Sequence, residues 1–452
     1  MPTVVLWFRR DLRLSDHPAL LEAVHAAGPG GSVLPLFVVD DRLWGPSGTN
    51  RRVFLSGCLA ALDASVDNRL VVRRGDPADV VANVAREVEA EQVFVTADFG
   101  PYGSSRDDAV ERALATNGRE LVRAGSPYAV EPGEVRTGAG EPYKVFTPFS
   151  KAWVAHGWPR PSRATSPVSW LDGVRSDGVP TSGDSAADLP VPGEAAAKRV
   201  ARRFWDTRLA EYDELRNDPG ADATSRLSPY LKWGCIHPRQ LLAKLGGSKA
   251  ERTFRSELCW REFYADVLFH RPETARDAFA PAMKAMRTDG AGTAPRFAAW
   301  CQGRTGYPII DAGMRQLAGE VWMHNRVRML VASFLVKDLH LDWTRGARFF
   351  MEHLVDGDLA SNQHGWQWVA GTGTDASPYF RIFNPVVQGE RFDPNGSYVR
   401  RWVPELAGVP TKYVHRPWDD PSGPPDGYPP PMVDHATERA DALRRYDDVR
   451  RS

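Results

Sequence analysis

The sequence predicts two structural parts, an N-terminal α/β domain with a parallel sheet and a C-terminal all-α domain. Three observations support this fold class. Short β-rich runs alternate with alanine-rich segments at the start of the chain, a stretch rich in proline, serine, glycine and aspartate follows, and apolar residues then recur at helical spacing. We expect domain boundaries at 1–130 for the α/β domain, 131–200 for the interdomain connection and 201–452 for the helical domain.

The strands of the sheet are predicted by four β-rich runs: 4–8 (VVLWF), 33–40 (VLPLFVVD), 69–74 (RLVVRR) and 92–96 (QVFVT). Helical segments such as HPALLEAVHAA lie between them, and this alternation is typical of parallel strands with helices on both faces. The first strand is followed by RRDLRLSD and not by a GxGxxG turn. We therefore expect a Rossmann-like sheet that lacks the dinucleotide fingerprint.

The stretch from about 157 to 193 has almost no apolar periodicity, which predicts a linker or a long surface connection. Beyond it, 252–270 and 307–343 carry apolar residues at three- and four-residue spacing and are expected to be helical. The segment HATERADALRRYDDVRR at 435–451 predicts a closing amphipathic helix with a solvated charged face.

Composition excludes several classes of protein. Lysine plus arginine equals aspartate plus glutamate at 57 each, so any nucleic-acid binding must come from a local basic patch. The four cysteines form no CxxC pair and no zinc spacing, which favours a reduced, cytoplasmic compartment and no metal site. The short apolar run near the N-terminus predicts a buried strand and not a signal peptide, and no run approaches the roughly 18 residues of a membrane span.

One short segment, DGDLASNQHGWQW at 356–368, places two carboxylates, an amide, an imidazole and two indoles close together. Ordinary core packing would favour aliphatic side chains here, whereas a redox or light-driven site would need such a set. A DxD metal site is disfavoured, because the segment lacks further carboxylates or histidines at suitable spacing.

Three further segments carry unusual chemistry. TSRLS at 224–228 can bind phosphate through hydroxyls and free backbone N–H groups, although N-capping by Thr224 or Ser225 is the simpler alternative. In ELCWREFY, Glu257, Trp260 and Arg261 share one helical face, which an ordinary surface ion pair would also explain. WMHNRVRM at 322–329 places an amide and a thioether one helical turn apart.

Together with WFRRDLRL at 7–14 and YFRIFNPVVQGERFDPNGSYVRRWVPEL at 379–406, these segments resemble the photolyase/cryptochrome family, and specifically the class I cyclobutane pyrimidine dimer photolyases. The resemblance covers nearly the whole chain. It implies an antenna-binding α/β domain and a helical FAD-binding catalytic domain. The implied activity is light-dependent DNA repair: excited reduced FAD gives an electron to a dimer that is flipped out of the duplex, the ring opens, and the electron returns.

By this resemblance the site residues fall into groups, and each group is expected to share one role. The expected FAD contacts are Tyr212, Thr224, Ser225, Leu227, Ser228, Phe254, Arg328, Asp356 and Asp358. The expected catalytic and lesion-contacting residues are Glu257, Trp260, Asn325, Met329, Asn362 and Trp368, and the expected electron carriers are Trp366 and Trp343. The expected DNA-binding residues are Arg216, Arg261, Arg326, Arg381 and Lys151.

Several of these roles have a physical reason. Asp356 would need a charged partner in a dry pocket, and Arg328 is the natural one. Asn362 would face flavin N5, where an amide can accept a hydrogen bond from a protonated nitrogen without adding charge. The (6-4) photolyases hold two proton-transferring histidines at the positions of Asn325 and Met329, so cyclobutane dimers are the favoured substrate. His324 is expected to be a packed, hydrogen-bonded residue.

The pattern also departs from the family. The distal tryptophan of the electron relay is replaced by Gly290, so photoreduction of resting FAD is expected to be weak or to take another route, while repair is not affected. Phe254 stands where some relatives have a tryptophan, and His364 stands where glycine is usual.

A second, antenna chromophore is expected in the α/β domain. Arg51, Asp98 and Lys232 favour 8-hydroxy-5-deazaflavin over methenyltetrahydrofolate, although some relatives bind flavin there or nothing. The expected partner is UV-damaged DNA, bound by a monomer that is cytoplasmic and associated with the nucleoid when on DNA. One rival function is a cryptochrome-type receptor, which is disfavoured by Asn362, by the intact set of expected lesion-contacting residues and by the lack of a long C-terminal tail. The other is a dark flavin oxidoreductase, for which no nicotinamide fingerprint is found.

Overall fold

The N-terminal part of the chain forms a five-stranded, all-parallel sheet with strand order β3-β2-β1-β4-β5. The computed structural model describes residues 2–162, 167–183, 185–290, 292–374 and 381–451; parts of the expected connection, and Tyr379 and Phe380 of the YFRIFNP segment, lie outside this range. The strands are β1 (Thr3–Phe8), β2 (Ser32–Val39), β3 (Val71–Arg74), β4 (Gln92–Val95) and β5 (Glu120–Arg123). The four expected strands are confirmed, and β5 was not predicted because its ELVR sequence is short and half charged.

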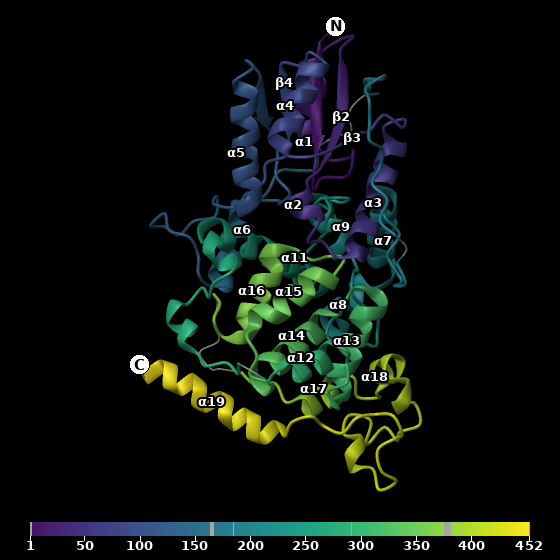
Figure 1. The fold of residues 1–452 in the computed structure, drawn as a ribbon, viewed down its shortest axis with the longest axis vertical. Helices are drawn as coiled ribbons and strands as arrows, with labels where there is room; N and C mark the ends of the chain where they lie inside the picture. The colour runs from purple at the N-terminus through teal and green to yellow at the C-terminus, as the bar shows by residue number, and fades with distance from the viewer. Residues whose placement is uncertain (1, 163–166, 184, 291, 375–380, 452) are drawn as a thin grey trace. The chain divides into compact units, whose positions relative to one another are not determined.

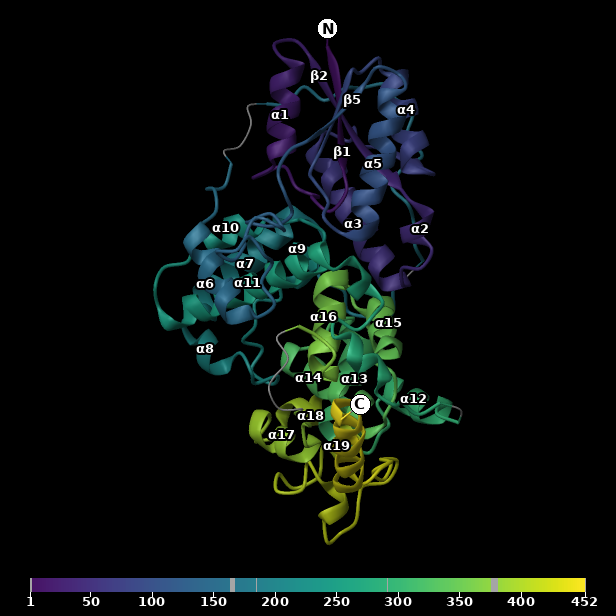
Figure 2. The same ribbon diagram turned by 90° about the vertical axis from the view of Figure 1, so that its left-hand side faces the viewer.

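Helices cover the sheet, as the alternation of the sequence predicts. They are α1 (Pro18–Ala27), α2 (Asp41–Trp44), α3 (Thr49–Ser65), α4 (Pro77–Glu87) and α5 (Pro101–Ala115) (Figure 1). Figure 2 shows α1 on one side of the strands and α4 and α5 on the other. Valines of α4 and α5 pack with Val5, Trp7 and Leu36 in one apolar cluster, which explains why the central strands read as continuous apolar runs.

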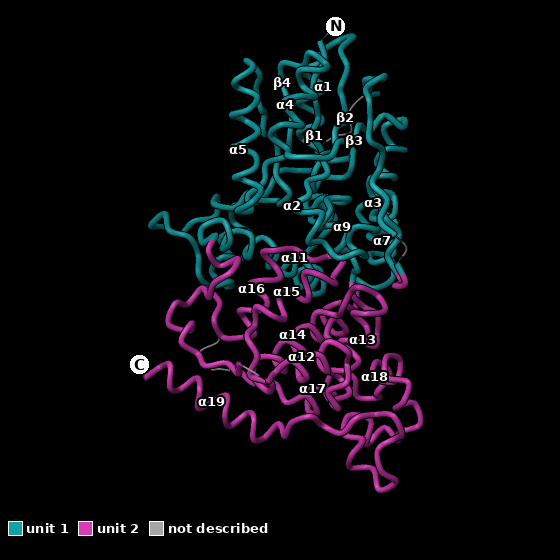
Figure 3. The backbone as a smooth tube through the Cα atoms, in the orientation of Figure 1, with its two compact units in different colours: residues 1–185, 189–209, 225–272 teal, residues 186–188, 210–224, 273–452 magenta. Residues whose placement is uncertain are grey.

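The chain divides into two compact units (Figure 3). Unit 1 comprises residues 1–185, 189–209 and 225–272, and unit 2 comprises 186–188, 210–224 and 273–452. The contacts thus assign 225–272 to the unit that contains the sheet, whereas composition had assigned this stretch to the helical domain. The division by contacts differs from the division by composition, so the expected domain boundaries stay a prediction.

Unit 1 also contains helices from beyond the sheet, and α11 is the longest of them. They are α6 (Phe146–His156), α7 (Glu194–Thr207), α9 (Ser228–Lys232), α10 (Pro238–Leu242) and α11 (Lys249–His270). A capping box formed by Ser248 and Glu251 starts α11. Further along, the buried Glu262 carboxylate accepts hydrogen bonds from the backbone N–H groups of Ala129 and Val130 and from Trp153 Nε1. These bonds fix the 126–133 loop against α11.

The stretch between residues 157 and 193 is a connection that hydrogen-bonds to the sheet. Its backbone exchanges hydrogen bonds with Val33 of β2 through Ser169 and Leu171, and Asp177 N donates to the carbonyl of Val72 in β3. The described residues of this stretch form no helix. This agrees with the expected long surface connection.

Unit 2 is helical and holds the second apolar core. Its helices are α8 (Tyr212–Leu215), α12 (Ala294–Cys301), α13 (Pro308–Glu320), α14 (Asn325–Ser333), α15 (Trp343–His353), α16 (Leu359–Ala370), α17 (Pro385–Phe392), α18 (Ser397–Trp402) and α19 (His435–Arg451). The periodic stretch 307–343 is not one helix: Val321 has a left-handed φ of 49° and ends α13, and His324 then caps α14. A Cβ on Gly313 would lie 2.4 Å from Val327 Cγ1, so this glycine permits the close approach of α13 and α14.

A π-helical turn, η4 (Phe334–Asp338), follows α14 and contacts α19. It carries Lys337, a residue that is 3% exposed and whose ammonium donates to the carbonyl of Arg381. Burial lowers the pKa of Lys337 to about 7, against a smaller opposing effect of Asp338. None of the helices in the described ranges is long and apolar enough to cross a bilayer.

Lys337 makes the stability of unit 2 depend on pH. The folded chain releases this proton near pH 7, while the unfolded chain keeps it to a pH of about 10.4, so the free energy of unfolding should rise with pH between these values. Lys337→Met removes this contribution. We expect the unfolding free energy of the variant, measured by urea denaturation, to fall relative to that of the wild type as pH rises from about 7 to about 10. Lys284→Met, at an exposed lysine, should give a plot of unfolding free energy against pH that runs parallel to that of the wild type. A parallel plot for Lys337→Met would contradict the role of Lys337 in the pH dependence.

Candidate active site

The segment 356–368 consists of a short loop followed by the helix α16. Asp358 is the N-cap of this helix, and its side chain accepts a hydrogen bond from Ser361 N at 3.1 Å. Gly371, with a φ of 81°, ends it. The two carboxylates therefore precede the helix, whereas the amide, the imidazole and both indoles lie on it.

Asp356 and Arg328 form the buried ion pair that the sequence predicts. Arg328 Nη2 lies 2.8 Å from Asp356 Oδ2, and the Asp356 side chain is 3% exposed. Arg328 Nε also donates to the carbonyl of Met323, which holds the guanidinium in place. Among the described residues no donor reaches the buried Asp356 Oδ1. This oxygen can accept a hydrogen bond from a ligand N–H or O–H group, which fits a flavin.

The amide of Asn362 is buried and has a defined orientation. Its Nδ2 donates to the carbonyl of Ala347 at 3.0 Å and to Gln363 Oε1 at 2.9 Å. Both amide protons are used in these bonds, so Oδ1 is left as the atom that can bind a ligand, and it can only accept. The geometry fits the role expected for an amide beside a protonated flavin nitrogen.

Trp366 lies in an aromatic cluster in unit 2. Its ring contacts Phe350 and Trp300 edge to face, with centroids 5.0 and 6.2 Å apart. Trp343, the expected second electron carrier, is buried in the first turn of α15. Sequence reasoning gave no role to Trp300, because it lies in a separate, weakly marked helix, α12.

His364, the departure from glycine, is a buried structural residue. Its Nδ1 lies 2.8 Å from the carbonyl of Ala360, which can only accept, so Nε2 accepts from the Thr274 hydroxyl at 3.0 Å. Burial lowers the pKa of His364 to about 4. The neutral imidazole thus ties α16 to the 3₁₀ turn η2 (Pro272–Ala275).

The lesion residues expected on α14 lie at its start. Asn325 is exposed and Met329 is half-buried one turn further on. Arg326 Nη1 lies 3.7 Å from Met329 Sδ, Nη2 donates to Asn217 Oδ1 at 2.8 Å, and the guanidinium is 4.6 Å from the ring centre of Phe392. Arg326 therefore has intramolecular partners besides any phosphate. His324 caps the helix through Nδ1, in agreement with the packed role expected for it.

The second lesion group, Glu257, Trp260 and Arg261, lies on α11 in unit 1. Trp260 stacks on Phe146 with ring centroids 3.6 Å apart and planes 6° from parallel. Arg261 Nη1 donates to the carbonyl of Pro127. The structure therefore covers one face of the Trp260 indole with protein. The groups on α11 and on α14 belong to different units.

The TSRLS segment enters the five-residue helix α9. Its N-cap is Leu227 with no side-chain cap, so the alternative of N-capping by Thr224 or Ser225 is wrong. Ser225 Oγ instead accepts from Leu227 N at 3.4 Å. Arg226 has a φ of 53°, and this left-handed residue turns the chain into the helix.

The remaining expected FAD and DNA contacts lie in several elements. Tyr212 is buried at the start of α8, and the Arg216 guanidinium lies 6.0 Å from its ring centre. In unit 1, Ser228 is exposed and Phe254 is buried. Trp368 is half-buried on α16, and Lys151 and Arg381 are exposed. Phe254 packs against Phe204 and Trp205.

The expected antenna residues all lie in unit 1. Arg51 is buried on α3, Lys232 lies 5.5 Å from the ring centre of Trp233, and Asp98 follows β4. Burial opposes ionisation of Asp98, but Arg10 and Arg106 hold its pKa well below the usual range. The strand order reverses between the neighbours β1 and β4, because β2 follows β1 on one side and β5 follows β4 on the other. The carboxyl ends of strands at such a switch point are where α/β sheets bind ligands.

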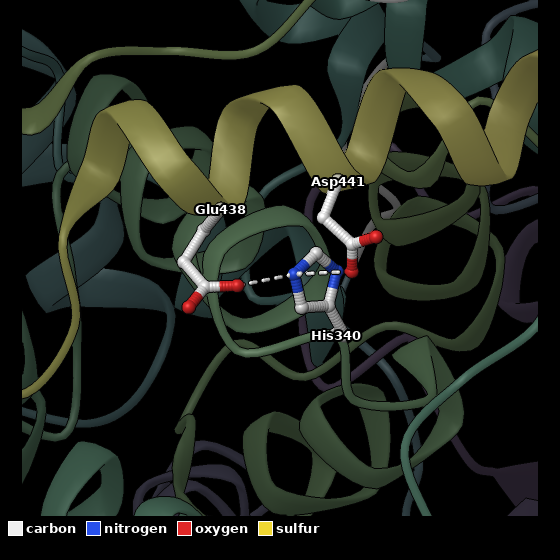
Figure 4. A group of neighbouring side chains, drawn as sticks. All are labelled: His340, Glu438 and Asp441. Atoms are coloured by element: carbon white, nitrogen blue, oxygen red, sulfur yellow. Dashed lines mark hydrogen bonds and ion pairs between the residues drawn. The ribbon is translucent and has the colours of Figure 1, made fainter.

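One cluster outside these groups has metal-ligand chemistry. His340, Glu438 and Asp441 place three ligand atoms within 4.8 Å of one another, and His340 Nε2 lies 2.7 Å from Glu438 Oε2 (Figure 4). Arg444 and Arg445 also bind the Asp441 carboxylate, and both would compete with a cation. We therefore assign the cluster to the docking of α19.

Comparison with known families decides the identity of the chain. The family described as DNA photolyase matches residues 4–167, and the one described as FAD binding domain of DNA photolyase matches residues 254–448. The chain belongs to the photolyase/cryptochrome family. Its C-terminal region is the FAD-binding domain of that family, and the expected fold class is confirmed.

Curated relatives match over nearly the whole chain. A deoxyribodipyrimidine photo-lyase of Streptomyces griseus is 43% identical and covers 97% of this chain and 98% of its own. One of Escherichia coli is 39% identical over the full length of both chains.

Solved photolyases share the fold. A class III photolyase from Agrobacterium tumefaciens has a TM-score of 0.90 at 38% identity and covers 100% of this chain and 98% of its own. A photolyase from Sulfolobus tokodaii with two FAD molecules has a TM-score of 0.88 at 30% identity and covers 99% and 100%. The likeness to a class III enzyme gives no support to the class I assignment expected from the sequence.

Gly346 tests the packing of Trp366. A Cβ at this position would lie 2.1 Å from Trp366 Cη2, so Gly346→Ala should displace the indole. We expect a loss of about 1–3 kcal/mol in unfolding free energy and a changed near-ultraviolet circular dichroism. Gly365→Ala on α16, where a Cβ meets no atom within 4 Å, is the control. Equal effects of the two substitutions would contradict this packing.

Proposed function

We propose that this chain is a deoxyribodipyrimidine photo-lyase, an enzyme that uses light to split cyclobutane pyrimidine dimers in DNA, with the lesion flipped out of the duplex. Curated relatives that match nearly the full length of the chain are named deoxyribodipyrimidine photo-lyase, which supports this activity. The observation that carries the proposal is the Asn362 amide, because it presents an acceptor without charge where an aspartate would add a charge or a labile proton.

The residues of the chain prepare the site in three ways. Arg328 and Asp356 would hold the FAD ring system, and Asn362 Oδ1 would accept a hydrogen bond from it. Trp260 and Trp368 would stack on the extruded dimer, and Glu257 would hydrogen-bond the edges of its bases. Asn325 and Met329 cannot transfer protons, which fits a ring opening that needs none. Reduced FAD, when bound, supplies the electron for ring opening upon excitation and takes it back.

Photoreduction of resting FAD is a separate function. Trp366 and Trp343 would carry the electron toward the flavin, and Gly290, an exposed glycine in place of the distal tryptophan, offers no ring to continue this route. Reductants can supply the reduced cofactor, so repair does not depend on the relay.

The antenna chromophore is proposed to be 8-hydroxy-5-deazaflavin, held in unit 1 with the help of Arg51, Asp98 and Lys232. The archaeal relative with two FAD molecules makes a second flavin the competing choice. Class I membership, a monomeric state and a cytoplasmic location stay predictions, and the proposed activity depends on none of them.

Repair itself is the first test. The purified protein, chemically reduced, should restore the absorbance of a thymine dimer in an oligonucleotide under blue or near-ultraviolet light and not in darkness. Glu257→Ala should lower the rate about tenfold to a hundredfold, because a charge-assisted hydrogen bond to the lesion contributes about 1.5–3 kcal/mol. Glu141→Gln, an exposed carboxylate of unit 1, is the control. Reduced protein that binds the lesion but restores no absorbance in light would refute the proposal.

DNA binding is proposed to use Arg216, Arg261, Arg326, Arg381 and Lys151. The exposed Arg381 is the cleanest member to test, and Arg381→Ala should weaken lesion binding and reduce the slope of log affinity against log salt by about 1. Arg401→Ala, which removes an exposed partner of Glu320, should leave the slope unchanged. An unchanged slope in both variants would show that Arg381 contacts no phosphate.

A further inference from the structure

Gln363 forms a polar link between Asn362 and the backbone of η2. Its Oε1 accepts from Asn362 Nδ2 at 2.9 Å, and its Nε2 donates to the carbonyl of Ala275 at 2.6 Å. Asn362 Nδ2 donates its other proton to the carbonyl of Ala347 on α15. Gln363 and Asn362 are both about nine-tenths buried, so these bonds are made away from competing water.

The direction of this chain of hydrogen bonds is fixed at both ends by groups that can only accept. The carbonyl of Ala275 requires the NH₂ group of Gln363, which turns Gln363 Oε1 toward Asn362. That oxygen and the carbonyl of Ala347 both require the NH₂ group of Asn362. A flipped Asn362 amide would place its oxygen against two acceptors and lose both bonds, so Oδ1 must point to the ligand side.

We propose that Gln363 is a positioning residue that sets the Asn362 amide with its oxygen toward the flavin. The proposal rests on the proposed function only in placing Asn362 beside flavin N5. Without the acceptor of Gln363, the Asn362 amide keeps one of its two bonds and can rotate or present its NH₂ group. A donor facing a protonated N5 disfavours the reduced cofactor.

Gln367, one turn further along α16, provides a matched control. It is fully buried, and it binds the same backbone segment, because its Nε2 donates to the carbonyls of Thr274 and Asp277 and its Oε1 accepts from Phe279 N. Asn362 gives its two amide protons to Ala347 and Gln363, so it donates none to Gln367. Gln367 therefore anchors the segment through three hydrogen bonds, where Gln363 makes one, and it lacks the orienting contact.

The test measures the reduction midpoint of bound FAD by spectroelectrochemistry in Gln363→Met and Gln367→Met. We expect Gln363→Met to shift the reduction equilibrium about tenfold toward oxidised FAD, and Gln367→Met to lower thermal stability without moving the midpoint. In an Asn362→Ala background, Gln363→Met should have no further effect, because the amide that it orients is absent. Gln363→Leu serves if the methionine variant loses FAD.

An unchanged midpoint in Gln363→Met would overturn the proposal. Equal shifts in both glutamine variants would also overturn it, since they would assign the effect to anchoring of η2. A shift that persists in the Asn362→Ala background would show that Gln363 acts on the flavin by another path. Failure of the photo-lyase proposal is distinguishable, because it would abolish light-dependent repair in the wild type and leave these midpoints measurable.

Discussion

The candidate site depends on one electrostatic constraint: a charged side chain removed from water needs a partner of opposite charge and hydrogen bonds in place of the lost solvent. Asp356 meets this condition through Arg328, which is itself held by the carbonyl of Met323. The pair joins α14 to the loop that leads into α16, so it also sets where the polar face of α16 lies. The acceptor oxygen left on Asp356 is available because the other is already used.

The polar side chains of α16 divide into two tasks. Gln363 and Gln367 bind backbone carbonyls between residues 274 and 279, and His364 binds the Thr274 hydroxyl. Asn362 uses its donors internally and keeps its oxygen for a ligand. Buried polar networks stabilise one arrangement only when every member is satisfied. The polar face of α16 would otherwise be poorly suited to a core. The neighbouring glutamines satisfy it, and the helix thereby becomes a rigid support for the Asn362 amide.

The C-terminal helix α19 is held by polar side-chain contacts and not by a broad apolar face. Ala442 is its only fully buried residue among those described, whereas His435 pairs with Asp338, His340 with Glu438, and Arg445 with Asp289. The sequence pattern of 435–451 predicts the helix and its charged surface. It does not predict that this surface faces unit 2, because periodicity identifies an apolar stripe and says nothing about which charges find partners.

The sequence by itself determined the alternation of strands and helices, the pairing of Asp356 with Arg328 and the family, because each rests on local patterns or spaced motifs. The tertiary structure decided the rest. Contacts, not composition, assigned 225–272 to unit 1, and they replaced the alternative of an N-cap at Thr224 or Ser225 with a turn in which Leu227 N donates to Ser225 Oγ. Gln363 looks like one polar residue among several in the sequence. Its role depends on folding, which brings the carbonyls of Ala275 and Ala347 to the two ends of the hydrogen-bonded pair Gln363 and Asn362. A carbonyl fixes the direction of a hydrogen bond only where it contacts the donor.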